Sequence, residues 1–211
     1  MKVQADIVVW GIGTPRTLRV YWTLDELGLD YRTERIVTRT AEMDRAEFIA
    51  VSPGKKIPAV QHGEIELTES GAITRFLMDT YSTEQWSPAE RAQIDRWTFF
   101  ALMEIDATAL YVIRRHEGLP NIYGNAPHAV SSSYEYANRQ IRVLDDALKD
   151  GRSYVLGDRF SEADIHLGTC LGWAGLLGME LPDRTAAYKR GLQTRSAYKT
   201  ANVANASATK L

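Results

Sequence analysis

The sequence has little of what covalent links and metal sites are built from. Its 211 residues include one cysteine, Cys170, and four histidines. A single cysteine excludes an internal disulfide, a CxxC redox pair and a zinc site with several cysteine ligands. The histidines are not paired at metal-ligand spacing, so we expect no bound metal. If the protein performs thiol chemistry, a pair of its own cysteines does not carry it out.

The chain also lacks an excess of charge of one sign and a long hydrophobic run. Its 25 Lys and Arg nearly balance its 27 Asp and Glu, giving a net charge of -2. That charge creates no field that would attract nucleic acid or an anionic membrane. No apolar run approaches the ~18 residues of a membrane span, and residues 3–6 (Val-Gln-Ala-Asp) break any signal-peptide core. We expect a cytoplasmic protein with neither nucleic-acid nor membrane partners. Asn205-Ala-Ser207 matches a glycosylation acceptor, which without a secretory signal we interpret as chance.

Strand and helix signals alternate along roughly the first eighty residues. The apolar run at 7–10 predicts a buried strand, and Thr14-Pro15 predicts the start of a helix that ends before Gly28. A second strand at 31–37 completes a βαβ unit with a parallel strand pair. The other expected elements are a helix-capable stretch at 41–49, a hairpin of strands ending at Val60 and covering 65–67, and a helix from Glu69-Ser70 to Tyr81. This order predicts a small mixed sheet with helices packed on it.

From Ser82 onward no convincing strand is predicted. A long helical pattern covers 89–115, and a Pro-, Gly- and Asn-rich loop follows it. The other expected helices cover 129–148, begin at Ser161, and follow Asp183 and Ser196. We therefore predict two domains of different class, an α/β domain at 1–83 and an all-helical domain at 84–211.

Gly11 and Gly13 stand where a strand-to-helix dinucleotide motif has its first two glycines. Arg16 replaces the third glycine, which in that motif allows close helix–strand packing. We interpret the segment as a flexible turn and expect no nucleotide cofactor.

Two short motifs in the α/β half could bind an extended peptide with a charged end. Pro58 opens the third strand, where a thioredoxin-like sheet carries a cis-proline, and this frees the peptide groups of Ile57 to pair with a ligand backbone. Glu69-Ser70 begins a helix, where a ligand carboxylate could bind free N–H groups while Glu69 pairs with an ammonium. The alternative is that Ser70 is simply an N-cap.

Taken in order, these motifs resemble those of cytosolic glutathione transferases. The resemblance rests on Thr14–Gly28, on Gly-Lys-Lys-Ile-Pro-Ala-Val60, on Glu69-Ser-Gly-Ala-Ile73, on Arg91-Ala-x-Ile-Asp-Arg-Trp97 and on Leu156–Asp164, which looks like the family's buried capping box. It implies a thioredoxin-like glutathione-binding domain, an all-α bundle domain that contributes the electrophile site, and usually a homodimer. It also implies that glutathione is the co-substrate.

The resemblance assigns roles residue by residue. Ile57 and Pro58 would hold the cysteinyl backbone of glutathione, Glu69 and Ser70 its γ-glutamyl end, and Lys56 would lie near its glycine carboxylate. Serine-type, bacterial-like members place a serine before the first helix. Thr14 holds that position here, and Arg16 and Thr17 are neighbouring donors that could share the role.

The energetics of thiol activation favour a hydroxyl donor. Lowering a thiol pKa from ~8.5 to below ~7 takes about 2 kcal/mol. A helix N-terminus supplies roughly 0.3–1 kcal/mol, and a hydrogen bond to a charged acceptor adds about 1.5–3 kcal/mol. The Thr14 hydroxyl is therefore needed as a donor. The alternative is that Thr14 is only a structural N-cap, since Thr-Pro is a favourable helix start.

The family places its electrophile site along the first long helix of the second domain. Met103, Ala107, Tyr111 and Arg114 follow helical spacing there and form the expected substrate pocket. The alternative is a helix face that is packed on its neighbours, with the arginine in solvent.

The resemblance implies a detoxifying transferase that activates the glutathione thiolate and conjugates it to an electrophilic small molecule. Two alternatives stay open on the same fold. One is a glutathione-dependent disulfide or peroxide reductase, isomerase or dehalogenase. The other is a non-catalytic ligand-binding or regulatory protein, since a fold does not fix a function.

Overall fold

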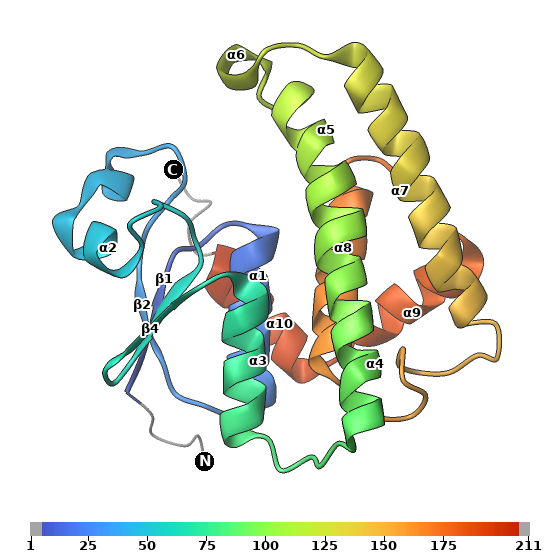
Figure 1. The fold of residues 1–211 in the computed structure, drawn as a ribbon, viewed down its shortest axis with the longest axis horizontal. Coiled ribbons are helices and arrows are strands. Elements are labelled where there is room, and N and C mark those ends of the chain that lie inside the picture. Colours follow the sequence, from blue (N-terminus) through green and yellow to red (C-terminus); the bar gives the residue numbers. More distant parts are fainter. Residues whose placement is uncertain (1–5, 207–211) are drawn as a thin grey trace. The chain divides into compact units, whose positions relative to one another are not determined.

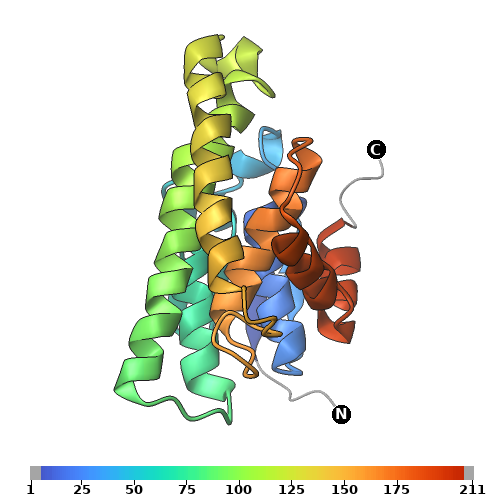
Figure 2. The same cartoon turned by 90° about the vertical axis from the view of Figure 1, so that its right-hand side faces the viewer.

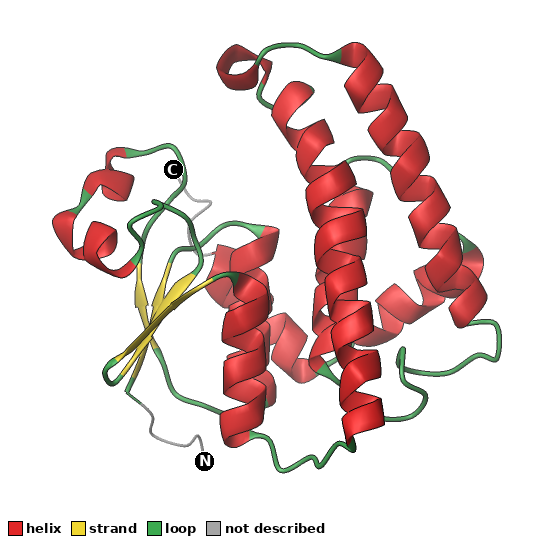
Figure 3. Ribbon diagram, in the orientation of Figure 1, coloured by secondary structure: helices red, strands yellow, loops and turns green. Residues whose placement is uncertain are grey.

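The computed structural model describes residues 6–206. Two compact units are found, one containing the described residues up to Gln85 and those from Gln193 onward, the other running from Trp86 to Leu192. The predicted fold class is confirmed, because the first unit is a mixed sheet with helices in thioredoxin-like order and the second is built from helices (Figure 3). Ser207 of the glycosylation match lies outside the described residues.

Four strands form the sheet of the first unit in the order β2-β1-β3-β4 (Figure 1). They are β1 (Ile7–Trp10), β2 (Arg32–Glu34), β3 (Ala59–His62) and β4 (Ile65–Thr68). β1 pairs in parallel with β2 and antiparallel with β3, which pairs antiparallel with β4. The predicted parallel pair and hairpin are both confirmed. β2 is shorter than the predicted 31–37.

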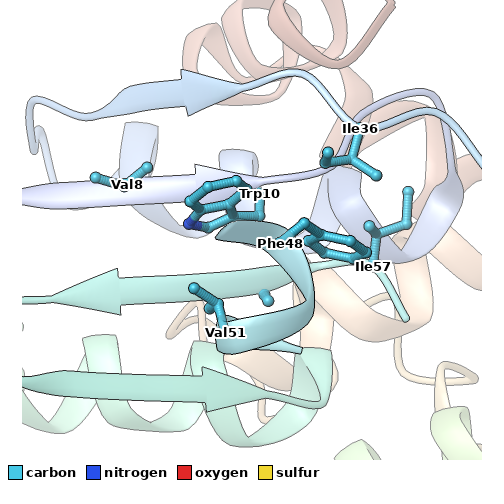
Figure 4. Close-up of a cluster of buried hydrophobic side chains, with 7 residues drawn as sticks. Val8, Trp10, Ile36, Phe48, Val51 and Ile57 are labelled. Atoms are coloured by element: carbon cyan, nitrogen blue, oxygen red, sulfur yellow. The ribbon is translucent and has the colours of Figure 1, made fainter. Parts of the chain in front are cut away.

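Helices lie on both faces of this sheet. α1 (Pro15–Glu26) and α3 (Ser70–Tyr81) pack together on one face, while the turn η1 (Ala41–Asp44) and α2 (Ala46–Val51) lie toward the other (Figure 1). On the α2 side, Trp10 and Phe48 pack with their ring centroids 6.1 Å apart (Figure 4). Alternate residues of β1 face opposite sides of the sheet. All four residues of β1 are buried, which requires helices on both faces of the sheet.

The last helix, α10 (Ser196–Ala206), belongs to the first unit. It packs along α1, with which it runs side by side in Figure 2. The predicted second domain covers all of 84–211, so the structural division differs from it at the C-terminal helix. The physical reason is the burial of Ala197, Ala201 and Asn205, which lie four residues apart on one face of α10.

Seven helical segments make up the second unit. They are α4 (Pro88–Phe99), η2 (Phe100–Leu110), α5 (Tyr111–His116), α6 (Pro120–Tyr123), α7 (Pro127–Ala147), α8 (Glu162–Leu176) and α9 (Asp183–Gln193, whose last residue falls in the first unit). α7 packs along η2 and α5, as Figure 2 also shows. α6 adds a helical turn within the predicted loop.

The predicted long helix at 89–115 is continuous, but its middle is not α-helical. Its eleven residues from Phe100 to Leu110 form a π-helix, and the Tyr111 N–H bonds to the Asp106 carbonyl, five residues back. Ala101, Ile105 and Ala109 recur every four residues and are fully buried.

Candidate functional site

The strand register brings three separate segments to one edge of the sheet. Trp10 pairs with Ala59, and Ala59 pairs with Thr68. Because these pairings are antiparallel, the chain that leaves β1, the chain that enters β3 and the chain that leaves β4 meet at the same edge. The segments are the turn at 11–14, the loop at 55–58 and the helix start at 69–70. The predicted glutathione-contact residues and Thr14 all belong to them.

Thr14 caps the first turn of α1. Its Oγ1 accepts a hydrogen bond from the Thr17 N–H at 3.0 Å, and the Thr17 Oγ1 accepts one from the Thr14 N–H at 3.0 Å. The two hydroxyl oxygens are 3.0 Å apart. Thr14 is half-buried, whereas Thr17 is fully buried. The first turn of α1 contains no acidic side chain, so nothing of its own compensates the positive end of the helix dipole.

The loop before β3 contains the expected cis peptide bond, between Ile57 and Pro58. Ser52 holds this loop, because its hydroxyl accepts from the Lys56 N–H and donates to the Lys56 carbonyl. Pairing of β3 begins at Ala59, so the peptide groups of Ile57 lie outside the ladder. The Lys56 side chain is exposed beside them.

The turn after β1 requires a glycine at position 11. Its φ is +108°, and a Cβ there would lie 2.4 Å from the Ile57 Cβ. No other residue fits at this distance without displacing the Ile57 loop. The glycine therefore serves the close approach of two site segments, in agreement with the interpretation of this segment as a turn.

Ser70 is not the N-cap of α3, which was the alternative interpretation of this helix start. Glu69 occupies the N-cap position, and Ser70 is the first helical residue. Glu69 has φ 66° and ψ 110°, a strained conformation for a residue with a Cβ. Such strain costs about 1–3 kcal/mol and clusters at functional sites. Its side chain makes no capping bond to the helix.

Arg19 belongs to this site but is not among the predicted site residues. It is 1% exposed, and its Nη1 donates to the Ser70 Oγ at 3.2 Å, joining α1 to the start of α3. The buried guanidinium adds positive charge at a helix N-terminus, which favours an anion there. A charged residue inside a mostly apolar helical segment is a signal that the sequence does contain, and Arg19 is such a residue. In the structure every residue of that segment, from Thr17 to Leu24, is buried.

The predicted electrophile residues lie on η2 and α5 of the second unit. Met103 is 56% exposed, and Ala107 is also exposed. Tyr111 and Arg114 are half-buried on α5. These four residues were grouped by α-helical spacing, whereas Met103 and Ala107 lie in the π-helix. That they line a substrate pocket stays a prediction.

Among residues 6–206, no helix is long and apolar enough to cross a membrane. In the same range no group of three or more His, Cys, Asp or Glu side chains could hold a metal ion. Cys170 is buried, with its thiol 3.4 Å from the Ala101 carbonyl, to which it donates.

The fold and this edge define a thioredoxin-like domain in which Thr14-Pro15 stands at the helix start and no cysteine is present in the turn. Comparison with known proteins makes the class specific. Residues 5–79 match the family model described as glutathione S-transferase, N-terminal domain, and residues 127–191 match that of the C-terminal domain.

Individual relatives agree with these matches. Glutathione S-transferase-like protein OpS6 of Beauveria bassiana is 30% identical over 158 residues, covering 72% of this chain and 71% of the relative. A glutathione S-transferase of Hyoscyamus muticus is 28% identical, covering 72% and 74%. A glutathione transferase family member from Pseudomonas fluorescens, solved with two glutathione bound, superposes with a TM-score of 0.78 at 26% identity over 93% of this chain and 92% of that one. The chain belongs to the glutathione S-transferase family.

Proposed function

We propose that this protein is a glutathione transferase that binds glutathione at the edge formed by 11–14, 55–58 and 69–70. There it stabilises the thiolate, whose sulfur bonds to an electrophilic carbon while a leaving group departs with its electron pair. The thiol proton passes to solvent. The observation that carries the proposal is the half-buried Thr14 hydroxyl at the uncompensated N-terminus of α1, on the same sheet edge as the cis-proline loop.

Glutathione is an extended tripeptide with two carboxylates, one ammonium and one thiol, and the edge offers a partner for each. The Ile57 peptide groups outside the ladder suit its cysteinyl backbone, as in the addition of a strand. The N-terminus of α3, with Ser70 and buried Arg19 beside it, suits the γ-glutamyl carboxylate, and the Glu69 carboxylate suits the ammonium. Exposed Lys56 suits the glycine carboxylate. The Pseudomonas fluorescens relative supports this ligand.

Thr14 is our candidate for the hydroxyl that donates to the thiolate. Thr17 is fully buried, and its hydroxyl oxygen lies 2.6 Å from the Asn205 Oδ1. Arg16 is half-buried in the first turn and would add positive charge near the sulfur rather than a hydroxyl donor. One hydrogen bond to the charged acceptor is worth about 1.5–3 kcal/mol, which with the helix dipole covers the shift that the thiol needs.

The remaining parts of the proposal follow the family. The acceptor would bind along Met103, Ala107, Tyr111 and Arg114, and we propose a homodimer that acts in the cytoplasm and detoxifies electrophiles. The exposed thioether of Met103 suits an apolar electrophile, and Arg114 a polar or anionic substituent on it.

Two measurements on the purified protein test this function. The first is the ultraviolet thiolate absorbance of bound glutathione at neutral pH, and the second is turnover with a chlorodinitrobenzene-type electrophile. We expect both to be positive. Glutathione-dependent disulfide reduction without substitution would replace conjugation by the reductase alternative. No thiolate absorbance at saturating glutathione would favour a non-catalytic ligand-binding or regulatory protein.

A further inference from the structure

The last described helix reaches back to the first turn of α1 through one side chain. Asn205 is 8% exposed. Its Oδ1 accepts hydrogen bonds from the Gly13 N–H at 3.0 Å and from the Thr17 hydroxyl at 2.6 Å. Its Nδ2 donates to the Thr14 carbonyl at 3.1 Å. One amide thus contacts three of the residues that carry the candidate thiolate site, which lie 188 to 192 residues away in sequence.

These contacts fix which way the amide points. In the opposite orientation the Nδ2 hydrogens would face the Gly13 N–H, which is also a donor, and the Oδ1 would face the Thr14 carbonyl, which is also an acceptor. The Gly13 N–H also donates to the Asn205 backbone carbonyl at 3.0 Å, and the Thr14 carbonyl also accepts from the Leu18 N–H at 3.1 Å. The orientation described is the one that places no donor against a donor and no acceptor against an acceptor. The Oδ1, which has no proton to donate, therefore faces the Thr17 hydroxyl.

The direction of the amide in turn directs the Thr17 hydroxyl proton. Thr17 has one proton, and the nearest acceptor to its Oγ1 is the Asn205 Oδ1 at 2.6 Å, compared with 2.8 Å for the Thr14 carbonyl and 3.0 Å for the Thr14 Oγ1. With that proton directed to Asn205, the Thr17 oxygen acts as an acceptor toward Thr14. The Thr14 hydroxyl has its own proton whichever way Thr17 points, and a thiolate is a stronger acceptor for it than the Thr17 oxygen. What the Asn205 contacts determine is where the first turn of α1 holds the Thr14 hydroxyl.

We propose that Asn205 is a positioning residue for thiolate formation. Its bonds to Gly13, Thr14 and Thr17 hold the first turn of α1 in the conformation from which the Thr14 hydroxyl donates to the glutathione sulfur. This inference rests on the proposed function, because it needs a thiolate at the N-terminus of α1.

The rest of α10 holds Asn205 in place. At the other end of α1, the guanidinium of Arg195, the residue just before α10, pairs with the Glu26 carboxylate through two contacts of 2.6 and 2.7 Å. Between the two ends, the Trp22 and Tyr198 rings pack edge to face at 4.8 Å. α10 is thus attached to α1 along its length, and its last turn delivers Asn205 to the candidate site. The burial of Asn205 also leaves its amide inaccessible for glycosylation in the folded chain.

The test compares Asn205→Ala with Asn202→Ala. Both remove an asparagine amide from the same helix, but Asn202 is exposed. The pKa of the bound glutathione thiol is measured by pH titration of the thiolate absorbance, together with kcat, KM and the melting temperature. In Asn205→Ala we expect the thiol pKa to rise by about one unit and kcat below that pKa to fall about tenfold. KM for glutathione should change less than about threefold, since the peptide contacts are elsewhere. Asn202→Ala should match the parent chain.

Two further variants separate positioning from a purely structural role. Asn205→Asp keeps the size and the acceptor but brings negative charge and loses the donor to Thr14. It should raise the thiol pKa more than Asn205→Ala does, and it serves as the test if the alanine variant does not fold. In a Thr17→Val background one of the three Asn205 contacts is already lost, so Asn205→Ala should shift the thiol pKa by less than it does in the parent chain.

The outcomes distinguish the two proposals. A parent chain without thiolate absorbance at saturating glutathione overturns the proposed function, and this inference with it. A parent chain with thiolate, and equal thiol pKa values in Asn205→Ala and Asn202→Ala, overturns the inference alone. A shift that persists in full in the Thr17→Val background overturns the part of the positioning assigned to the Asn205–Thr17 contact.

Discussion

The two units contain the same local motif at the start of a buried helix, but with different chemistry. In each, an N-cap hydroxyl residue and the third helical residue bond reciprocally, Thr14 with Thr17 at α1 and Ser161 with Asp164 at α8. Such a reciprocal pair is a capping box, and we call the two pairs the α1 box (Thr14 and Thr17) and the α8 box (Ser161 and Asp164). In the α8 box the third helical residue is a carboxylate that compensates the helix dipole, and both residues are fully buried. At α1 both side chains are neutral hydroxyls and Thr14 is half-buried.

This difference separates a stabilising cap from a site that can accept an anion. The Asp164 carboxylate accepts from the Val155 and Ser161 N–H groups at 2.8 and 2.9 Å, and from the Tyr188 hydroxyl at 2.6 Å. Its own charge already occupies the positive end of α8. The first turn of α1 has no such charge, so an external thiolate can take that place.

Breaking the α8 box should have the largest effect. Asp164→Ala leaves the buried donors of Val155, Ser161 and Tyr188 without their acceptor, each worth about 1–3 kcal/mol, so we expect a loss of roughly 3–5 kcal/mol in the free energy of unfolding. Urea denaturation measures this loss. Asp158→Ala removes an exposed aspartate nearby and should cost less than about 0.5 kcal/mol. Equal stability of the two variants would show that the α8 box does not stabilise the second unit.

The α8 box should also give a distinct pH dependence. Burial raises the Asp164 pKa from 3.8 to about 6, against the opposing effect of its hydrogen bonds from Tyr188, Val155 and Ser161. The folded state therefore holds the proton more tightly than the unfolded chain. The resulting stabilisation is complete below about pH 4 and is lost as the pH rises through about 6, by about 3 kcal/mol in all.

The measurement is the difference in unfolding free energy between the parent chain and Asp164→Asn, from pH 4 to 7. Subtraction removes the contributions of the other carboxylates. A difference that stays constant over this range would contradict the raised pKa.

Breaking the α1 box should affect activity more than stability. Thr14→Ala removes the proposed donor, and we expect kcat to fall at least tenfold, or about 1.4 kcal/mol in activation free energy. Loss of the N-cap should cost about 1 kcal/mol of stability, which leaves the protein folded. Steady-state kinetics and thermal unfolding measure the two effects.

Thr14→Ser retains the hydroxyl and is the matched control, expected within about threefold of the parent chain. Unchanged turnover in Thr14→Ala would move the role to Arg16 or Thr17.

The fold could largely be predicted because its signals are local. The apolar run of β1, Thr14-Pro15 at the start of α1 and Gly28 after its end each specify structure through neighbouring residues. The position of the cis-proline followed from the order of elements. The π-helix η2 did not, because a four-residue repeat fits an α-helix almost as well over a few turns.

The candidate site could be predicted only where it is built on the sheet. Register places Thr14, Ile57 and Ser70 at one edge once the strands are known. Asn205 could not be found in this way, since its partners are set by the packing of α10 on α1. The sequence around Asn205 shows only a weak helix and a chance glycosylation match.

The smallest expected effect comes from making α1 resemble α8. Arg16→Glu adds a negative charge to the first turn of α1, where α8 has Glu162 and Asp164. The helix dipole then acts partly on the protein's own carboxylate, and a charge in this turn is worth about 0.3–1 kcal/mol. We expect the pKa of the bound glutathione thiol to rise by about half a unit, with glutathione still bound. Arg16→Gln, which removes the positive charge without adding a negative one, should give a smaller rise. Equal thiol pKa values in the parent chain and both variants would mean that the compensation of the dipole does not distinguish the two helix starts, and that the difference between them lies in the hydroxyls alone.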